Sequence, residues 1–478
     1  MGPRVRVGLS LSMMMLSIAN AACSLPVTGE ASLESQGAAP PSPASQPPPS
    51  LTGWFYVVSQ REGYVTVLNG RNFQRVHRID LWAYEWERAF PPGEPRDPSV
   101  LEAIQREARP FEVWAVPGAS VLYVTNRSPH GDRLWVIDPN THTVQRAIAT
   151  GTPAPHRLAF SPTQPLAAVS HLYASPGVVT FLDTRIHRVV GRVQTTGTRT
   201  RDVIFSRDGR YLFVSQQGYA RSTGNLGGVD VLDVQAQRIV ETIPVTGSRA
   251  MALSPDGRTL AVASFAEGWV GLVDTETWDL FARVDVGGRP GACSFSPDGR
   301  KLYVGVFRNP ATGTGDEFVV VDVASRSVRT RIQAGRQPGR VFFPPGRPET
   351  ALGVNERDTR VMVLDTRRDT VTKVIEVPLG GYAMDFTPDG RFALLTCRRS
   401  REAVILDLES LRVHHVIAEA GYGNGGVRWI SPPRSLEQQS RRIAKGGAAG
   451  AFLEEKRRSP WVQHRGGATV AAGGVSWR

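Results

Sequence analysis

The sequence predicts an all-β protein, a β-propeller built from four-stranded antiparallel blades, and two observations support this class. One pattern of four short β-rich runs separated by turn residues recurs along residues 54–433, with a spacing of about 42 to 48 residues that matches one blade. The composition is 41% hydrophobic with three cysteines in 478 residues, which describes a core-forming chain without a disulfide framework. We therefore expect a ring of repeats rather than one large core.

Eight blades are expected because two independent counts agree. The inner-strand pattern typified by ACSFSPDG occurs eight times, and the outer three strands of a copy also begin at eight places. These places are Phe55, Val121, Leu166, Tyr211, Thr259, Lys301, Thr350 and Phe392. The repeat ends on an inner-type strand at 426–432, so that strand can complete the first blade and close the ring without an exposed sheet edge. A seven-bladed ring with the first copy outside it is the alternative.

A short polar side chain ends the third strand of every copy, where it can cap the following turn. These residues are Asn69, Asp138, Asp183, Asp233, Asp274, Asp322, Asp365 and Asp407. A row of carboxylates resembles a metal site, but copies in separate blades would be spread around the ring, so we expect them to form turns. The Ser-Pro-Asp-Gly-Arg runs at 254–258 and 296–300 are likewise expected to be tight connections in which glycine supplies a positive φ.

Residues 1–22 are expected to be a secretory signal peptide. Two arginines precede a short apolar stretch that ends in small residues and is too short to span a bilayer. The Ala-Ala-Cys sequence that ends at Cys23 resembles the end of a bacterial lipobox, which predicts lipidation of Cys23 and a membrane-anchored lipoprotein at the cell envelope. Cleavage after Ala21 would instead give a soluble periplasmic or secreted protein.

Two flanking segments differ in composition from the repeat region at 53–433. Residues 23–52 form a tether rich in Pro, Ser and Ala, and residues 434–478 are expected to be a disordered basic tail. Of the net charge of +12, the tail carries +6 and the signal peptide +2, which leaves +4 for the rest. So small a surplus argues against nucleic acid as a partner.

The repeats carry a recognisable signature. Residues 123–126 read Tyr-Val-Thr-Asn, and weaker versions occur at 212–215, 260–263 and 302–305. Together with the Ser-Pro-Asp-Gly runs, this pattern resembles the YVTN-family β-propeller repeats of bacterial and archaeal surface proteins. The resemblance implies the fold but no defined activity. Such repeats are similar to the propellers of methylamine dehydrogenase heavy chains, cytochrome d1 and lactonases, which take their chemistry from a partner subunit, a heme or added carboxylates.

The long connections fall on one face of the predicted ring. In a propeller, the links from second to third strand and from fourth strand to the next inner strand share a face. The insertions at 82–110, 126–133, 216–228 and 307–317 all belong to these links, whereas the opposite turns are short. Loops on a rigid scaffold commonly carry binding residues, so we assign recognition to this face.

Arginines recur on this face just ahead of the inner strands. Glycine two positions before Arg199, Arg249 and Arg289 indicates equivalent placement in successive blades. Guanidinium groups bind carboxylate or phosphate through paired hydrogen bonds, so we expect an anionic ligand at the channel mouth, although screened surface arginines are the alternative. The candidate ligand-binding residues are Arg199, Arg201, Arg249, Arg289, Arg336, Arg340, Trp82, Tyr84, Trp86, Asn126, Arg127 and Gln216.

The insertion at 82–110 is expected to hold a short helix from Pro98 to Ala108, with Asp97 as its cap. The helix and the aromatic residues before it could cover the channel as a lid. Alternatively, the aromatic side chains pack against the first blade.

No motif for a cofactor, nucleotide or structural metal occurs, so we expect no cofactor and no metal. His130, His156 and His171 fall near the same rim, but loop histidines at unrelated spacings are more often solvated. The leading hypothesis is a non-catalytic, envelope-tethered propeller that binds an envelope protein, a glycan or an anionic small molecule. The alternative is a propeller subunit of an enzyme or redox complex, quinoprotein-, heme- or lactonase-like, whose chemistry comes from a cofactor or partner.

Overall fold

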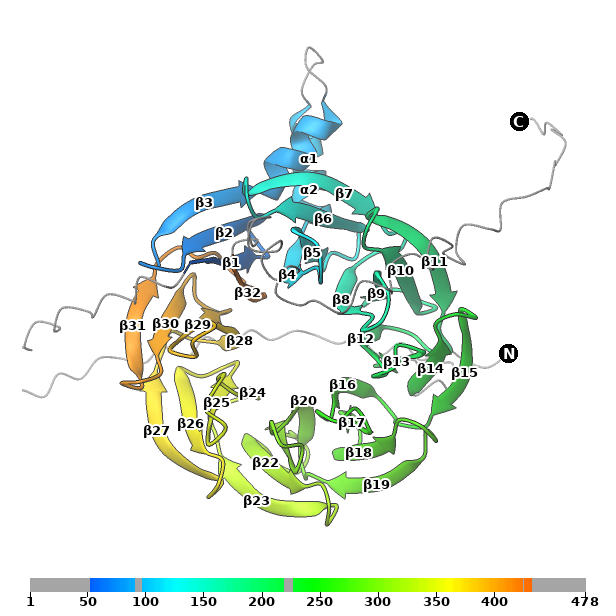
Figure 1. Cartoon of the computed structure of the whole chain (residues 1–478), viewed down its shortest axis with the longest axis vertical. Coiled ribbons are helices and arrows are strands. Elements are labelled where there is room, and N and C mark those ends of the chain that lie inside the picture. The colour runs from blue at the N-terminus through cyan, green and yellow to red at the C-terminus, as the bar shows by residue number, and fades with distance from the viewer. Residues whose placement is uncertain (1–51, 91–96, 219–226, 424, 432–478) are drawn as a thin grey trace, which may run out of the picture. The chain divides into compact units, whose positions relative to one another are not determined.

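Eight four-stranded antiparallel sheets surround a central axis in the computed structural model (Figure 1). The structure describes residues 52–90, 97–218, 227–423 and 425–431, and every count below refers to them. The predicted eight-bladed propeller is therefore confirmed. The signal peptide, Cys23, nearly all of the tether and the basic tail lie outside the described residues.

The four positions in a blade are each filled by eight strands. The inner strands are β4 (Pro110–Ala115), β8 (Pro155–Phe160), β12 (Thr200–Phe205), β16 (Ser248–Leu253), β20 (Arg289–Phe295), β24 (Pro338–Phe342), β28 (Gly381–Phe386) and β32 (Val427–Ile430). The second strands are β1 (Trp54–Ser59), β5 (Leu122–Asn126), β9 (Leu166–His171), β13 (Tyr211–Gln216), β17 (Thr259–Ser264), β21 (Lys301–Phe307), β25 (Thr350–Asn355) and β29 (Phe392–Cys397).

The third strands are β2 (Tyr64–Asn69), β6 (Arg133–Asp138), β10 (Val178–Asp183), β14 (Val229–Asp233), β18 (Trp269–Asp274), β22 (Glu317–Asp322), β26 (Arg360–Asp365) and β30 (Ala403–Asp407). The outer strands are β3 (Arg75–Asp80), β7 (Thr143–Ala149), β11 (Arg188–Gln194), β15 (Arg238–Ile243), β19 (Leu280–Asp285), β23 (Ser327–Gln333), β27 (Thr370–Glu376) and β31 (Arg412–Ile417). Strand β32 pairs with β1 in the order β3-β2-β1-β32, so the last strand completes the first blade as expected.

The hydrophobic pattern explains where each strand lies in its blade. Second and third strands are almost wholly apolar and buried, as in β5 and β18, because both of their faces pack against neighbouring blades. Outer strands such as β23 alternate exposed and less exposed residues, since one face meets solvent. The core is a series of clusters between blades, for example one that joins Phe213 and Val231 of one blade to Leu260 and Val273 of the next.

The turn residues behave as the sequence predicted. The Asp138 carboxylate accepts a hydrogen bond from the backbone N–H of Asn140 (2.8 Å), and Asp274 accepts one from Glu276 (2.8 Å). Asn69 does the same in the first blade for the N–H of Arg71 (2.7 Å). These side chains therefore cap turns, each in a separate blade.

In three of these turns, the residue four positions after the capping aspartate holds neighbouring blades together, which the sequence did not reveal. His142, His187 and Asp369 have positive φ, and each side chain reaches the preceding blade. Their partners are tyrosine hydroxyls: Tyr56 for His142 (2.8 Å), Tyr123 for His187 (2.7 Å) and Tyr303 for Asp369 (2.7 Å).

Two helices connect the first and second blades. The expected helix is α2 (Pro98–Glu107) with Asp97 as its N-cap, whereas α1 (Leu81–Ala89), capped by Asp80, was not predicted. Both lie at the periphery of the ring and not over its axis (Figure 1), so the lid interpretation is wrong. Trp82, Tyr84 and Trp86 pack instead against the core between the first two blades. Neither helix has the length and apolar content needed to cross a membrane.

Candidate functional site

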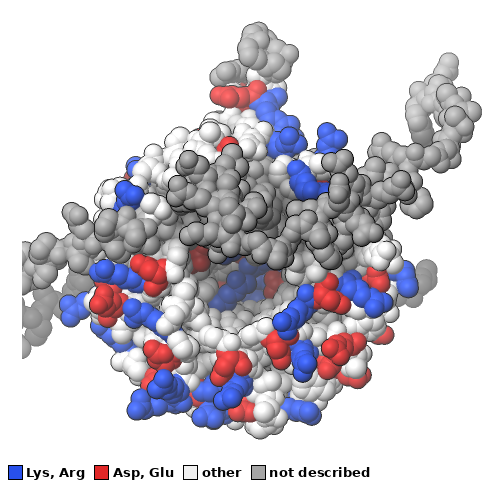
Figure 2. Space-filling model, in the orientation of Figure 1, with Lys and Arg blue, Asp and Glu red and all other residues white. Residues whose placement is uncertain are grey.

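A cavity of about 450 Å³ lies on the propeller axis, within the hollow that Figure 2 shows at the centre of the ring. Inner strands supply its wall, because most of them shift register directly after their first cross-strand pair. Such a bulge bends the strand and re-aims the side chains that follow it. The wall residues that follow these first pairs include Glu112, Arg157, Arg201, Asp202, Arg249, Ala250, Arg340, Tyr382 and Ala383.

Connections between strands supply the mouth of the cavity. In five blades the residue directly after the second strand lines it: Arg127, Gln217, Phe265, Glu356 and Arg398. Arg199 and Gln337 contribute from the links that precede inner strands. The cavity therefore opens on the face that carries the long connections, which is the face to which recognition was assigned.

The cavity is strongly basic. Seven arginines and three carboxylates line it, a formal surplus of four positive charges. The arginines are Arg127, Arg157, Arg199, Arg201, Arg249, Arg340 and Arg398, and the carboxylates are Glu112, Asp202 and Glu356. Such a wall attracts anions, and its low exposure to water strengthens that attraction.

Arg157 is neutralised by its neighbours. Its Nη1 atom lies 2.5 Å from Glu112 Oε1, and its Nε atom lies 3.5 Å from Asp202 Oδ1. Burial opposes the charge of Arg157, but Glu112, Tyr382 and Asp202 raise its pKa above the usual arginine value. Arg157 therefore joins the inner strands β4, β8 and β12 through ion pairs.

Arg201 and Arg249 show the opposite arrangement, because each faces another positive charge. Burial, followed by the charge of Arg249, lowers the pKa of Arg201 to about 9. Arg201 is therefore still protonated at neutral pH, beside a second guanidinium group. Arg249 stacks on Phe265 and Phe307, with its guanidinium carbon 4.6 and 5.0 Å from the ring centres. A bound anion would relieve this repulsion.

Two aromatic rings, those of Phe111 and Tyr382, are contacted by other arginines of the cavity. The Phe111 ring is contacted by the guanidinium groups of Arg127 (5.0 Å) and Arg398 (5.7 Å), and Arg398 also lies 4.7 Å from the Tyr382 ring centre. The His156 ring stacks on Phe111 at 4.7 Å with an interplanar angle of 15°. Phe111 and His156 are buried and do not line the cavity, so the rings in its wall are those of Phe265 and Tyr382.

His156 differs from the other two histidines that the sequence singled out. It is 1% exposed, and burial, followed by the charges of Arg157, Arg201 and Arg127, holds its pKa well below the usual value. Its Nε2 atom has no hydrogen-bond partner among the described residues. In His171, by contrast, both ring nitrogens are bonded, to Pro153 O (3.1 Å) and Thr180 Oγ1 (2.9 Å). His130 lies exposed on the connection after β5.

The structure brings five of the predicted ligand-binding residues together at the cavity, namely Arg127, Arg199, Arg201, Arg249 and Arg340. The others lie elsewhere. Arg289 approaches the Phe265 ring from outside the cavity wall, and the backbone N–H of Arg336 donates to Asp358. Asn126 and Gln216 are buried and hydrogen-bonded to neighbouring loops, since they support connections. The tryptophans and the tyrosine at 82–86 belong to the helix packing described above.

The sequence reasoning missed the residues that the inner strands contribute. Phe111, Glu112, Arg157, Asp202 and Tyr382 stand within runs that were interpreted as structural repeats. A signal was present, because charged residues interrupt the runs PHRLAF and TRDVIF at places where other copies hold glycine or alanine. Within the described part of the chain, no group of three or more His, Cys, Asp and Glu side chains could hold a metal ion.

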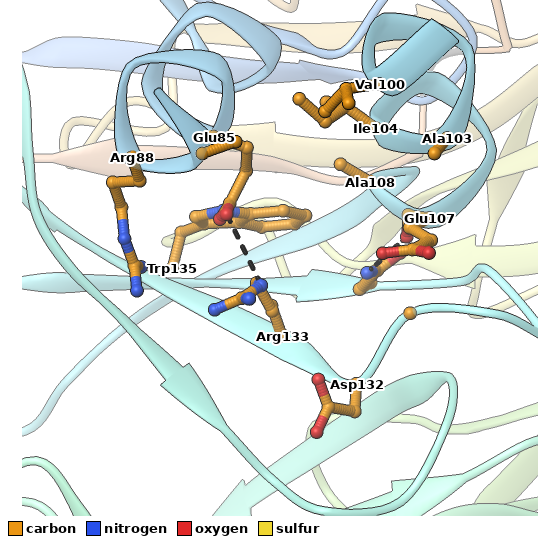
Figure 3. Close-up of a pocket in the computed structure, with 13 residues that line it drawn as sticks. Glu85, Arg88, Val100, Ala103, Ile104, Glu107, Ala108, Asp132, Arg133 and Trp135 are labelled. Atoms are coloured by element: carbon orange, nitrogen blue, oxygen red, sulfur yellow. Dashed lines mark hydrogen bonds and ion pairs between the residues drawn. The ribbon is translucent and has the colours of Figure 1, made fainter. Parts of the chain in front are cut away.

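A second cavity, of about 270 Å³, lies between the helices and the second blade (Figure 3). Val100 and Ile104 of α2 line one side, and the Trp135 indole lies opposite. The buried Glu85 accepts a hydrogen bond from Trp135 Nε1 (2.8 Å) and pairs with Arg133 (3.3 Å). The polar groups at the centre of this second cavity, Glu85, Trp135 and Arg133, are therefore paired with one another.

Comparisons with known proteins find similarity to a heme domain over part of the chain. A family model described as cytochrome D1 heme domain matches residues 164–294. Protein NirF of Pseudomonas aeruginosa is 33% identical over 118 residues, which cover 24% of this chain and 28% of that relative's length. The match thus spans less than a third of the curated relative.

Two solved structures share the fold. Dihydro-heme d1 dehydrogenase NirN in complex with DHE superposes with a TM-score of 0.58 at 17% identity, covering 80% of this chain and 77% of NirN. Apo AztD from Citrobacter koseri gives a TM-score of 0.56 at 12% identity, covering 80% of this chain and 99% of AztD. At these identities the likeness concerns the propeller fold alone.

These findings correct the leading hypothesis from the sequence. The match to a heme domain contradicts a non-catalytic binder of a protein, a glycan or an anionic ligand and favours the heme-like alternative. The resemblance to YVTN-family repeats is consistent with the propeller fold, although a different family model matches. The similarities are also consistent with an exported protein, whereas lipidation of Cys23 stays a prediction.

Proposed function

We propose that this chain binds a heme d1-type tetrapyrrole in its axial cavity and acts in the formation or use of that group. One observation carries the proposal: a single cavity combines an arginine-rich wall with two aromatic side chains, Phe265 and Tyr382. Arg199, Arg201 and Arg249 all fall within the stretch that resembles a cytochrome D1 heme domain. The similarity to Protein NirF and the shared fold with NirN support the same reading.

The residues fit the chemistry of such a ligand. A tetrapyrrole is a flat, largely apolar ring with carboxylate groups at its edge. Arg201 and Arg249 offer guanidinium groups to the carboxylates, and Phe265 and Tyr382 offer ring surfaces. A cavity of about 450 Å³ also lies within the usual range for small-molecule sites of about 300 to 1,000 Å³.

His156 adjoins the cavity wall, but its ring is 1% exposed and does not line the cavity, so it would have to turn toward the cavity to hold the iron. Its ring is neutral, which is the form that ligates metals, and its Nε2 atom has no hydrogen-bond partner among the described residues. It precedes Arg157, a residue of the cavity wall, on strand β8. When bound, the group would supply a redox-active iron and a conjugated ring. The protein's own part is to bind the carboxylates, orient the ring and exclude water.

The location belongs to the same proposal. An exported chain would meet its ligand outside the cytoplasm, and a lipid at Cys23 would hold it at the envelope. The soluble periplasmic or secreted form remains the alternative. An anionic small molecule is thus the partner to which the cavity is suited, and an envelope protein that delivers or accepts it is a further partner.

Titration with hemin tests the proposed function. Hemin shares the flat iron ring and the carboxylates, so the purified protein should bind one equivalent with a saturable change in the visible absorption spectrum. Bound ligand should also raise the melting temperature, because it binds only the folded chain. The absence of saturable binding, with hemin and with extracted heme d1, would contradict the proposal.

A substitution of His156 examines the iron ligand separately. His156→Gln should retain hemin, since the arginines remain, but should shift the absorption bands that report the iron's ligands. His130→Gln, on the same face and exposed, is the matched control and should leave the spectrum unchanged. Identical spectra for the wild type and His156→Gln would remove His156 from the site while leaving the cavity in place.

A further inference from the structure

We propose that Phe307 is a positioning residue, which together with Phe265 holds the guanidinium group of Arg249 in place to bind a carboxylate of the ligand. This role rests on the proposed function and deepens it, because it names the side chains that set the geometry of carboxylate binding. Phe307 is 8% exposed and does not line the cavity, so it acts through Arg249 and not by touching the ligand.

The guanidinium group of Arg249 lies over two phenylalanine rings. Its carbon atom is 4.6 Å from the ring centre of Phe265 and 5.0 Å from that of Phe307. The two ring centres are 6.0 Å apart, and the ring planes are nearly perpendicular, at 83°. The rings therefore form a corner around the guanidinium group, and their negative π faces attract its charge.

Arg249 needs such support because it lies beside another cation. Burial, followed by the charge of Arg249, lowers the pKa of Arg201 to about 9, so the two guanidinium groups repel each other. The aromatic corner opposes this repulsion and keeps both groups at the cavity wall. A cation–π contact uses no N–H group of the arginine, so it does not compete with a ligand carboxylate for hydrogen bonds.

Gly291 provides the space that the Phe307 ring occupies. Phe307 holds the place in its blade that Phe265 holds in the preceding blade, and Gly291 stands on β20 where the preceding inner strand, β16, carries Arg249. A Cβ atom added at Gly291 would lie closer than 3.0 Å to three atoms of the Phe307 ring. A side chain at position 291 would therefore push that ring away from Arg249.

Two compounds that differ only in their carboxylates test this role. Hemin and hemin dimethyl ester share the flat iron ring, but the ester has no free carboxylate, so the ratio of their affinities measures carboxylate binding. Phe307→Leu should lower the affinity for hemin about fivefold and leave the affinity for the ester unchanged, because one cation–π contact of Arg249 is lost. The matched control Phe318→Leu removes a fully buried ring from the same blade. It should lower the melting temperature without changing the ratio.

A double-mutant cycle shows whether Phe307 acts through Arg249. Arg249→Ala alone should lower the ratio, and the addition of Phe307→Leu should then have no further effect. Gly291→Ala offers a second route that retains Phe307, and it should lower the ratio as Phe307→Leu does. This variant decides the matter if Phe307→Leu does not fold.

The results separate the positioning role from the proposed function. Saturable hemin binding with an unchanged ratio in folded Phe307→Leu and Gly291→Ala would overturn the role of Phe307 and leave the proposed function intact. Additive effects of Phe307→Leu and Arg249→Ala would also overturn that role, since Phe307 would then not act through Arg249. No saturable binding of either compound by the wild type would overturn both proposals together.

Discussion

The two cavities of this molecule contain similar residues but use them differently. At the periphery, the buried carboxylate of Glu85 is satisfied by Trp135 and Arg133, so the polar groups there stabilise the contact between helices and blade. On the axis, Arg157 is matched in this way, by Glu112 and Asp202. Arg201 instead lies beside the positive charge of Arg249. Neighbouring positive charges therefore distinguish the axial cavity as the place for an anionic ligand.

The largest effect on stability should follow from removing Arg157, which pairs with Glu112 and Asp202 on the axis. Arg157→Met leaves two buried carboxylates without their partner, so the free energy of unfolding should fall by about 3 to 5 kcal/mol. Urea denaturation measures this change in the free energy of unfolding. The control Arg185→Met removes an arginine that is 59% exposed and pairs with Asp183, so it should cost less than about 1 kcal/mol. Equal losses in the two variants would mean that the axial ion pairs contribute no more than a surface pair.

Replacing the neighbouring Arg201 and Arg249 should affect ligand binding more than stability. Arg201→Ala with Arg249→Ala should weaken hemin binding about 100-fold, since two charge-assisted hydrogen bonds are lost. The free energy of unfolding should change by no more than about 1 kcal/mol, because relief of repulsion offsets the lost stacking.

The matched control for that pair is Arg289→Ala with Arg336→Ala, which removes the same charge from outside the cavity wall. We expect less than about a threefold change in hemin affinity there, since exposed charges act weakly through solvent. Comparable losses in both double variants would show that overall charge, and not the cavity, governs binding.

Removing a charged side chain from the second cavity, at the periphery, should affect stability but not ligand binding. Glu85→Ala leaves the Trp135 indole N–H buried without an acceptor, which should cost about 2 kcal/mol of unfolding free energy. Hemin affinity should stay within experimental error of the wild type. A loss of binding in this variant would indicate that the two cavities are coupled.

The smallest expected effect concerns pH. Burial lowers the pKa of His171 to about 4, so the unfolded chain binds a proton more readily than the folded chain between that value and about 6.5. Stability contributed by the neutral His171 is present above that window and is lost as the pH falls through it. From about pH 7.5 to 5.5 the loss should be about 1 kcal/mol. His171→Gln should lessen the dependence in urea denaturation, and the buried His156, whose pKa is also lowered, should keep part of it. An unchanged slope would argue against His171 as a source.

Much of the fold could be predicted because the repeat is local. Spacing, apolar strands and capped turns gave eight blades, the closing strand at 426–432 and the helix at 98–107. The first helix, Leu81–Ala89, was missed because its aromatic residues pack against two blades that the local pattern does not bring together. The lengths of the loops predicted the face on which the cavity opens. Five arginines of the cavity could be predicted from their position before or within inner strands or after a second strand.

The sequence by itself determined the ring, its closure and the face that carries the long connections, because these depend on periods and turn residues within one copy. Only the tertiary structure decided which charges meet. Glu112, Arg157 and Asp202 come from three successive copies, and their pairing depends on bulges that re-aim side chains across the axis. Distances between blades decide whether an arginine lies beside a carboxylate or beside another arginine. The sequence of a single repeat does not contain this information.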